Sequence, residues 1–177
     1  GMCITNNEEL AEKMRILKDH GMSKNKRYWH DIVGYNYRLT NIQAAIGVAQ
    51  LENIDKFIEI RRKNAKLYNT LLQDTKGITL QEEEKYAKHV YWMYSVLLNE
   101  QAKLPRTELM QKLKSAGIET REFFYPLHIM PPYKQFALNQ KFPITDNISQ
   151  KGMNLPSSSR LSRDDITYIC ETIKKIV

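Results

Sequence analysis

Residues 34–52 read GYNYRLTNIQAAIGVAQLE and carry more structural information than any other segment of the chain. The segment begins as a short polar and aromatic loop, which ends where a helix is expected to start. Thr40 is placed to cap that helix, and Gln43 is placed to reach back to it, which together form a capping box. Apolar residues then recur at helical spacing, at Ile42, Ala45, Ile46 and Ala49. The segment therefore predicts a loop whose end is fixed by a well-defined helix start.

The composition is that of a globular protein. The chain has 177 residues, of which 42% are hydrophobic and 27% charged, which fits one or two compact units. Cys3 and Cys170 are its two cysteines, and neither lies in a pattern with zinc-ligand spacing, so we expect a reducing, cytoplasmic location. No apolar stretch is long enough to span a bilayer and no signal peptide is visible, so we expect no membrane partner.

The net charge of +7 would attract phosphates, nucleic acid or an acidic membrane surface. We interpret basic runs such as Arg61-Arg62-Lys63 as charges that keep a helix face in water. No pattern of a zinc finger, an RNA-recognition motif or a basic zipper is present, so a nucleic-acid-binding protein is only a weak alternative.

The expected elements change in character along the chain. A first helix, capped by Asn6, ends at Gly21, and a long helix runs from Thr40 to about residue 73 with a bend near residues 53–55. Short strands are expected at residues 2–5, 78–80, 89–98 and 118–120. Further helices are expected over residues 105–116, with Gly117 as the stop, and from Ser162, which Asp165 would help to cap. This alternation predicts a small α+β domain from about residue 74 onward.

Three segments resemble one enzyme family. Residues 34–52 are similar to the segment of the DegT/DnrJ/EryC1/StrS sugar aminotransferases that carries a G-x-N-x-R loop. Residues 118–128 resemble the family's I-x-T-R-x-x-F-Y-P-L-H segment, and residues 155–158 resemble its L-P-S-S loop. The resemblance implies an α/β fold, namely the C-terminal part of an aspartate-aminotransferase-like (fold type I) transferase dependent on pyridoxal phosphate. Residues 1–73 would then be the remnant of the large cofactor-binding domain, and residues 74–177 the small α+β domain.

The resemblance implies two cofactor-binding residues. In the family, the Asn of the G-x-N-x-R loop meets the phosphate of pyridoxal phosphate across a dimer interface, and Asn36 occupies that position. Arg38, two residues later, offers a guanidinium fork to the same kind of anion. The residues themselves leave alternatives open, because Asn36 would also suit a plain turn and Arg38 would also pair with an acidic neighbour.

The resemblance also implies substrate-binding residues at Trp29, His30, Arg121, Tyr125 and His128. Trp29 and His30 match a family loop near the sugar-nucleotide pocket, although a loop histidine is often only a solvated surface residue. Arg121 and His128 are candidates for the diphosphate and the sugar hydroxyls of a nucleotide sugar. No metal site and no Ser-His-Asp order is apparent, so a hydrolase is not supported.

Taken together, the resemblance implies the C-terminal portion of a sugar-nucleotide aminotransferase, closest to perosamine-synthase-like members. The complete enzyme would be a homodimer that moves an amino group from glutamate to a keto-sugar nucleotide. The family's Schiff-base lysine is expected upstream of this sequence, so the chain alone is expected to be inactive and without bound cofactor. The alternative is a stand-alone interaction or binding module from a truncated gene.

Overall fold

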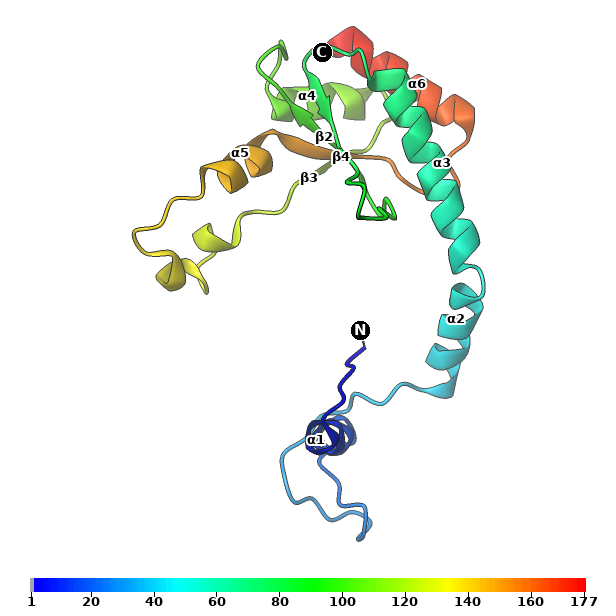
Figure 1. Ribbon diagram of the computed structural model, residues 1–177, viewed down its shortest axis with the longest axis vertical. Coiled ribbons are helices and arrows are strands. Elements are labelled where there is room, and N and C mark those ends of the chain that lie inside the picture. Colours follow the sequence, from blue (N-terminus) through cyan, green and yellow to red (C-terminus); the bar gives the residue numbers. More distant parts are fainter. Residues whose placement is uncertain (1) are drawn as a thin grey trace. The chain divides into compact units, whose positions relative to one another are not determined.

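A four-stranded antiparallel sheet organises the C-terminal part of the chain in the computed structural model, which describes residues 2–177 (Figure 1). The strand order is β1-β2-β4-β3. The strands are β1 (Ile78–Leu80), β2 (Tyr94–Leu98), β3 (Arg121–Glu122) and β4 (Gly152–Leu155). The last strand in sequence thus lies between β2 and β3, where Met153 stands opposite both Val96 and Glu122.

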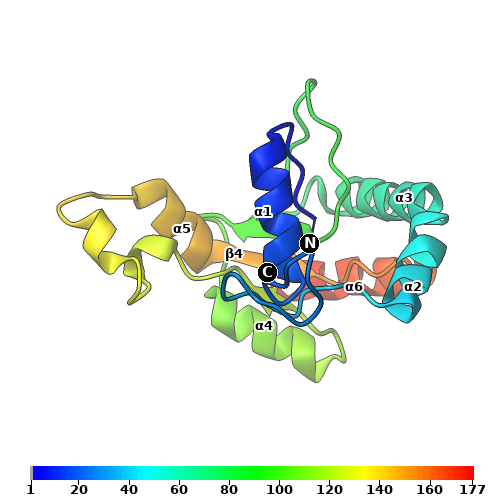
Figure 2. The ribbon, with the colours of Figure 1, turned by 90° about the horizontal axis from the view of Figure 1, so that it is seen from below.

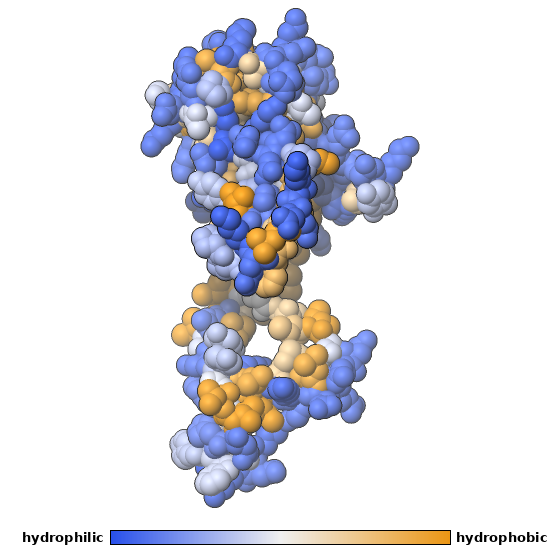
Figure 3. All heavy atoms as spheres, turned by 90° about the vertical axis from the view of Figure 1, so that its left-hand side faces the viewer, coloured by the Kyte–Doolittle hydropathy of each residue, from blue (hydrophilic) through white to orange (hydrophobic). Residues whose placement is uncertain are grey.

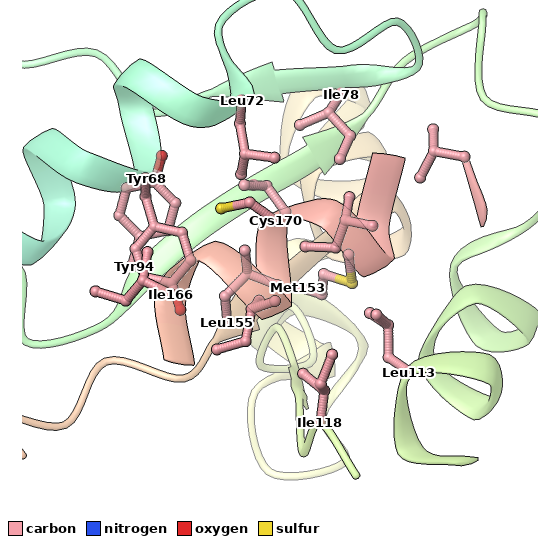
Figure 4. Packing of buried hydrophobic residues seen from close by; sticks show 14 of the residues in the cluster. Tyr68, Leu72, Ile78, Tyr94, Leu113, Ile118, Met153, Leu155, Ile166 and Cys170 are labelled. Carbon is pink, nitrogen blue, oxygen red and sulfur yellow. The ribbon is translucent and has the colours of Figure 1, made fainter. Parts of the chain in front are cut away.

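The core lies between this sheet and three helices, α3 (Ile54–Leu72), α4 (Arg106–Ser115) and α6 (Arg163–Ile176). Alternate residues of β2 point into it, because successive side chains of a strand face opposite sides. Figure 4 shows Tyr94 of β2 packing beside Tyr68 of α3 and Ile166 of α6. The rings of Tyr68 and Tyr94 are stacked with centroids 4.5 Å apart. This packing gives the C-terminal unit a core of its own.

Several expected elements are confirmed. The strand at 78–80 is β1, and α4 lies within the expected residues 105–116, with Leu109 and Leu113 buried and Gly117 at φ +76° as its stop. Ser162 and Asp165 form the expected capping box of α6. The first strand is wrong, since residues 2–5 form none, and the expected strand at 89–98 begins only at Tyr94. The strand expected at 118–120 lies instead at 121–122.

Between β3 and β4 the chain leaves the sheet and returns to it (Figures 1 and 2). This segment contains two short 3₁₀ helices, η1 (Leu127–Ile129) and η2 (Lys134–Ala137), followed by α5 (Pro143–Lys151). The C-terminal end of this segment is held by Arg106 of α4. Its Nη1 donates to the carbonyl of Ser149 at 2.5 Å and to that of Gly152 at 3.2 Å.

Residues up to Asn53 form a separate unit that contains α1 (Glu8–Lys18) and α2 (Asn41–Leu51). The N-cap of α1 is Asn7, whose side chain accepts from the Leu10 amide at 2.9 Å, and not Asn6 as expected. None of the described hydrophobic residues of this unit is buried. Figure 3 shows apolar side chains on its surface. The exposed large hydrophobic residues of this unit include four of α2: Ile42, Ile46, Val48 and Leu51.

The two units meet at residues 53 and 54, where the long helix expected from Thr40 is interrupted. The interruption falls where the bend was expected. Because α3 packs against α6, it belongs by its contacts to the second unit. A domain boundary of the complete enzyme is expected from the sequence between residues 73 and 74, and that boundary stays a prediction.

Across residues 2–177, no helix combines the length and the apolar character that a membrane crossing requires.

Candidate functional site

The loop at residues 34–38 is anchored by its backbone to the end of α1. Tyr35 donates to the carbonyl of Leu17 at 2.7 Å, and Tyr37 donates to that of Lys18 at 2.9 Å. In return, His20 donates to the carbonyl of Tyr35 at 2.9 Å. These bonds involve no side chain, so they fix the path of the loop whatever its residues present to solvent.

Two glycines make this close approach possible. A Cβ placed on Gly34 would lie 2.0 Å from the backbone nitrogen of Gly21, far inside van der Waals contact. Gly21 itself has φ +70°, and a Cβ there would lie 2.0 Å from the carbonyl oxygen of Ile32. Only residues without side chains fit at both positions. The two glycines therefore set where the loop that follows Gly34 runs.

Asn36 and Arg38 alternate with two stacked tyrosines in this loop. The rings of Tyr35 and Tyr37 stack with centroids 5.2 Å apart, so these two residues point the same way. Where backbone is extended, residues two positions apart share a side, so Asn36 and Arg38 would lie on the side opposite the two rings. Thr40 then starts α2 through the expected capping box, with Thr40 N donating to Gln43 Oε1 at 2.9 Å.

These two side chains fit a phosphate group. Asn36 is exposed, its backbone is paired with that of Asp19, and within residues 2–177 its amide has no hydrogen-bond partner. Arg38 lies 3.5 Å from Asp19 Oδ1, a long contact with the guanidinium largely exposed. Such a surface pair contributes little, so Arg38 can turn to another anion. An unpaired amide donor and a largely exposed guanidinium two residues apart in a fixed loop suit a phosphate.

Trp29 and His30 lie in the loop between Gly21 and Gly34. The Trp29 indole donates to Asp31 Oδ1 at 2.9 Å, and Lys26 Nζ stands 4.0 Å from the ring centroid. His30 Nδ1 lies 3.0 Å from the carbonyl oxygen of His20, which can only accept, so Nδ1 carries the proton. No hydrogen bond to Nε2 is present among the described residues. His30 is therefore oriented by the backbone and still offers one nitrogen to a ligand.

In the second unit, Arg121 of β3 lines a cavity of about 400 Å³. Other walls come from Trp92 and from residues 154–158, which include the L-P-S-S loop. Among the described residues the Arg121 guanidinium forms no ion pair. Glu119 also lines the cavity and contributes one carboxylate to it. The cavity thus pairs a free guanidinium with an exposed indole, a combination suited to an anion attached to a flat ring.

The structure does not place Tyr125 or His128 in that cavity. Tyr125 is exposed, in the segment that leaves the sheet after β3. His128 lies in η1, where Nε2 is 2.9 Å from Asp146 Oδ1 and the ring stacks on Phe142 at 4.6 Å. His128 is thus held against α5, and its role toward a substrate remains a prediction.

The interpretation of residues 61–63 as a solvated face is wrong for two of the three. Arg61 Nη1 donates to the carbonyls of Trp92 and Ser157, both at 2.9 Å. Arg62 Nη1 and Nη2 donate to the Glu83 carboxylate at 2.6 and 3.2 Å, and this pairing lowers the pKa of Glu83. A signal was present, because Arg61 stands four residues before buried Ala65 and so lies on the inward stripe of α3.

The chain is similar to known proteins over nearly its whole length. The model of the DegT/DnrJ/EryC1/StrS aminotransferase family matches residues 1–174. The GDP-perosamine synthase of Vibrio cholerae is 42% identical over 176 residues, covering 98% of this chain and 47% of the relative. EpsN of Bacillus subtilis, which carries the name of a pyridoxal phosphate-dependent aminotransferase, is 29% identical over 98% of this chain and 45% of its own length. The chain therefore spans about half the length of the curated relatives it matches.

The fold agrees with solved enzymes. The crystal structure of DesV from S. venezuelae, in complex with a ketimine intermediate, superposes with a TM-score of 0.82 and 26% identity, over 97% of this chain and 45% of that one. The expected fold class is confirmed, since the chain has the fold of the C-terminal part of fold type I enzymes, with a small α+β domain. The chain belongs to the DegT/DnrJ/EryC1/StrS aminotransferase family.

Proposed function

We propose that this chain is the C-terminal portion of a sugar-nucleotide aminotransferase that transfers an amino group from glutamate to a keto-sugar nucleotide. The observation that carries the proposal is the exposed Asn36 amide, held by the Gly21–Gly34 contact and left without a partner among the described residues. Sequence identity of 42% to a GDP-perosamine synthase supports the sugar-nucleotide substrate. Pyridoxal phosphate would carry the amino group between the two substrates, since the cofactor supplies this chemistry when bound.

In this proposal the chain contributes binding and orientation. Asn36 donates from its side-chain amide to the cofactor phosphate in the opposite subunit of a homodimer, and Arg38 adds charge beside it. Arg121 and His128 would bind the diphosphate and sugar of the substrate, and Trp29, His30 and Tyr125 are the other substrate-binding residues of the proposal. The free guanidinium of Arg121 and the free Nε2 of His30 support these assignments.

The lysine that holds the cofactor is not among those of this chain. A reactive lysine needs burial or a neighbouring cation to lose its proton near neutral pH. Every described lysine is exposed except Lys151, which is half-buried and paired with Glu100. We therefore expect the chain alone to be inactive. Borohydride reduction of a mixture with pyridoxal phosphate should give scattered, substoichiometric labelling, and one stoichiometric adduct at a single lysine would contradict the proposal.

The test of the function uses a chimaera in which this chain replaces the matching region of the Vibrio cholerae relative. The chimaera should catalyse glutamate-dependent amination of a keto-sugar nucleotide. Asn36→Ala should weaken retention of pyridoxal phosphate about tenfold to a hundredfold, because a charge-assisted hydrogen bond contributes about 1.5–3 kcal/mol and 1.4 kcal/mol is tenfold in affinity. Asn36→Asp should be worse, because it sets a carboxylate against a phosphate.

The two variants separate binding from a turn role. If Asn36 serves only a turn, Asp substitutes well, because both residues tolerate the same backbone and make the same local bonds. Cofactor dissociation measured by dialysis and absorbance decides between these readings. An Asp variant that retains cofactor like the unchanged chimaera would refute the phosphate contact.

A further inference from the structure

The loop at residues 156–158 is held by its backbone. Three consecutive carbonyl oxygens of this loop accept hydrogen bonds from three side chains of α3. The donors and acceptors are Tyr68 Oη to Pro156 at 2.9 Å, Arg61 Nη1 to Ser157 at 2.9 Å and Asn64 Nδ2 to Ser158 at 3.4 Å. The three donors stand at positions i, i+3 and i+7 of one helix, which places them on one face. One face of α3 therefore bonds all three carbonyl oxygens of the loop.

Arg61 also reaches a second segment. Its Nη1 donates to the carbonyl of Trp92 at 2.9 Å and lies 3.5 Å from that of Tyr91. The Ser157 hydroxyl donates to the same Trp92 carbonyl at 3.1 Å. One partly buried guanidinium therefore joins the residues just before β2 to the residues just after β4.

Those two segments are two walls of the cavity that Arg121 lines. Beyond the pairing of Tyr94 with Leu155, the bonds of Arg61 and of the Ser157 hydroxyl hold Trp92 and the 156–158 loop together, and Arg61 thereby helps to set the width of the space in front of Arg121. Arg61 Nη1 donates to backbone carbonyl oxygens, whereas the Arg121 guanidinium has no ion-pair partner in residues 2–177. The two arginines thus serve different purposes, although both line one cavity.

We propose that Arg61 is a positioning residue, which holds Trp92 and the 156–158 loop at the separation at which Arg121 and Trp92 receive the nucleoside diphosphate part of the substrate. The identity of that ligand rests on the proposed function. The positioning role rests on the hydrogen bonds of Arg61 and can be measured without any ligand.

Arginine is required for this role because of its shape. A guanidinium is planar and offers several donors in fixed directions, so it can serve carbonyls from two segments at once. The single ammonium of lysine is a compact point charge on a flexible stem, and it does not reproduce that fixed arrangement. Methionine keeps much of the apolar stem and removes every donor.

The experiment uses Trp92 as its own reporter. The chain has two tryptophans, so Trp29→Phe leaves Trp92 as the single fluorophore. In this background Arg61→Met is compared with Arg62→Met. The second variant is a matched control, because Arg62 anchors the neighbouring residues through Glu83 and the carbonyl of His89 but does not line the cavity. Time-resolved anisotropy in this background measures the mobility of Trp92. Titration with GDP measures binding in the same arginine variants with Trp29 restored, because Trp29 is itself a proposed substrate-binding residue.

Arg61→Met should give Trp92 a fast, large-amplitude depolarisation, and should weaken GDP binding at least tenfold. Arg62→Met should leave both within about threefold of the protein in which both arginines are unchanged. Arg61→Lys should behave like Arg61→Met, and it serves as the second variant if the methionine protein does not fold. Equal anisotropy and equal affinity in the Arg61 and Arg62 variants would overturn the proposal. If the protein with Trp29, Arg61 and Arg62 all unchanged does not bind GDP but the anisotropy contrast holds, the positioning role stands and the nucleotide assignment of the cavity is wrong.

Discussion

Gly34 illustrates how one residue places a functional side chain two positions away. The position a Cβ would occupy on Gly34 faces the backbone of Gly21, and the hydrogen bonds that follow it hold Tyr35 and Tyr37 to the end of α1. The position of Asn36 is thereby fixed by backbone contacts rather than by bonds of its own side chain, which stays available for a ligand.

Gly34→Ala should disrupt this arrangement. Its methyl group would lie 2.0 Å from the nitrogen of Gly21, and such overpacking typically costs about 1–3 kcal/mol. The amide hydrogens of Tyr35 and Tyr37 should then exchange roughly tenfold faster or more. Hydrogen exchange followed by NMR measures this, with Gly47→Ala as control, because no described atom lies within 4 Å of a Cβ there. Unchanged exchange in Gly34→Ala would contradict the close-packing argument.

At the scale of single residues, the sequence was informative about position and less so about contacts. The motif around Asn36 located the loop, and the structure adds that its amide is free. Arg61 was missed because a run of three basic residues usually faces water. Its acceptors, at residues 92 and 157, lie 31 and 96 positions away in sequence, so no local pattern reveals them.

At the scale of elements, local signals worked where the physics is local. Capping boxes at Thr40 and Ser162 and the stop at Gly117 depend on neighbours within a few residues, and all three are confirmed. Strand β4 was not predicted, because Gly152 and Asn154 are residues that strands usually avoid. It forms because Met153 and Leu155 are buried between the neighbouring strands and the helices, which is a contact between distant segments.

The capping box of α6 predicts a dependence on pH. Asp165 Oδ2 accepts from the amide and hydroxyl of Ser162 at 2.8 and 2.7 Å, and these bonds lower the pKa of Asp165 below its usual 3.8. A carboxyl whose pKa is lowered by folding stabilises the protein above that usual value, and this contribution is lost as the pH falls through the folded pKa.

Ser162→Ala should therefore lower Tm by about 2–4 °C at neutral pH, the shift expected for one lost N-cap in a protein of this size. The difference from the unchanged protein should shrink as the pH falls below 3.8. Thermal unfolding followed by circular dichroism measures both effects. Thr167→Ala is the control on the same helix, because its hydroxyl only bonds back to the carbonyl of Arg163. A difference in Tm that stays constant down to acid pH would contradict the role of Asp165.

At the scale of the whole molecule, the two units differ in how they are stabilised. The unit from Ile54 onward has a core shared by helices and sheet. The described hydrophobic residues before it are all at least partly exposed, and α2 alone exposes four large ones. Exposed apolar surface of this extent marks a place where another polypeptide packs.

We therefore expect the chain to self-associate. Sedimentation velocity over a range of concentrations should show species larger than a monomer. Ile46→Lys, on α2, should shift the distribution toward monomer, whereas Ile144→Lys, at a still more exposed position on α5, should not. A clean monomer at high concentration, or equal effects of the two variants, would count against association through α2.

The row of bonds from α3 has a consequence for how this enzyme family can diversify. Tyr68 and Asn64 recognise only carbonyl oxygens of the 156–158 loop, and every residue has a carbonyl oxygen. The side chain of Ser158 therefore takes no part in the bonds that hold the loop to α3. Its hydroxyl accepts only a local bond, from the Arg160 amide at 3.2 Å. Mutation to a residue that keeps this turn, such as Asp or Asn, can change the chemistry of the cavity wall while α3 still holds the loop, which makes the position a natural starting point for altering substrate preference by laboratory evolution.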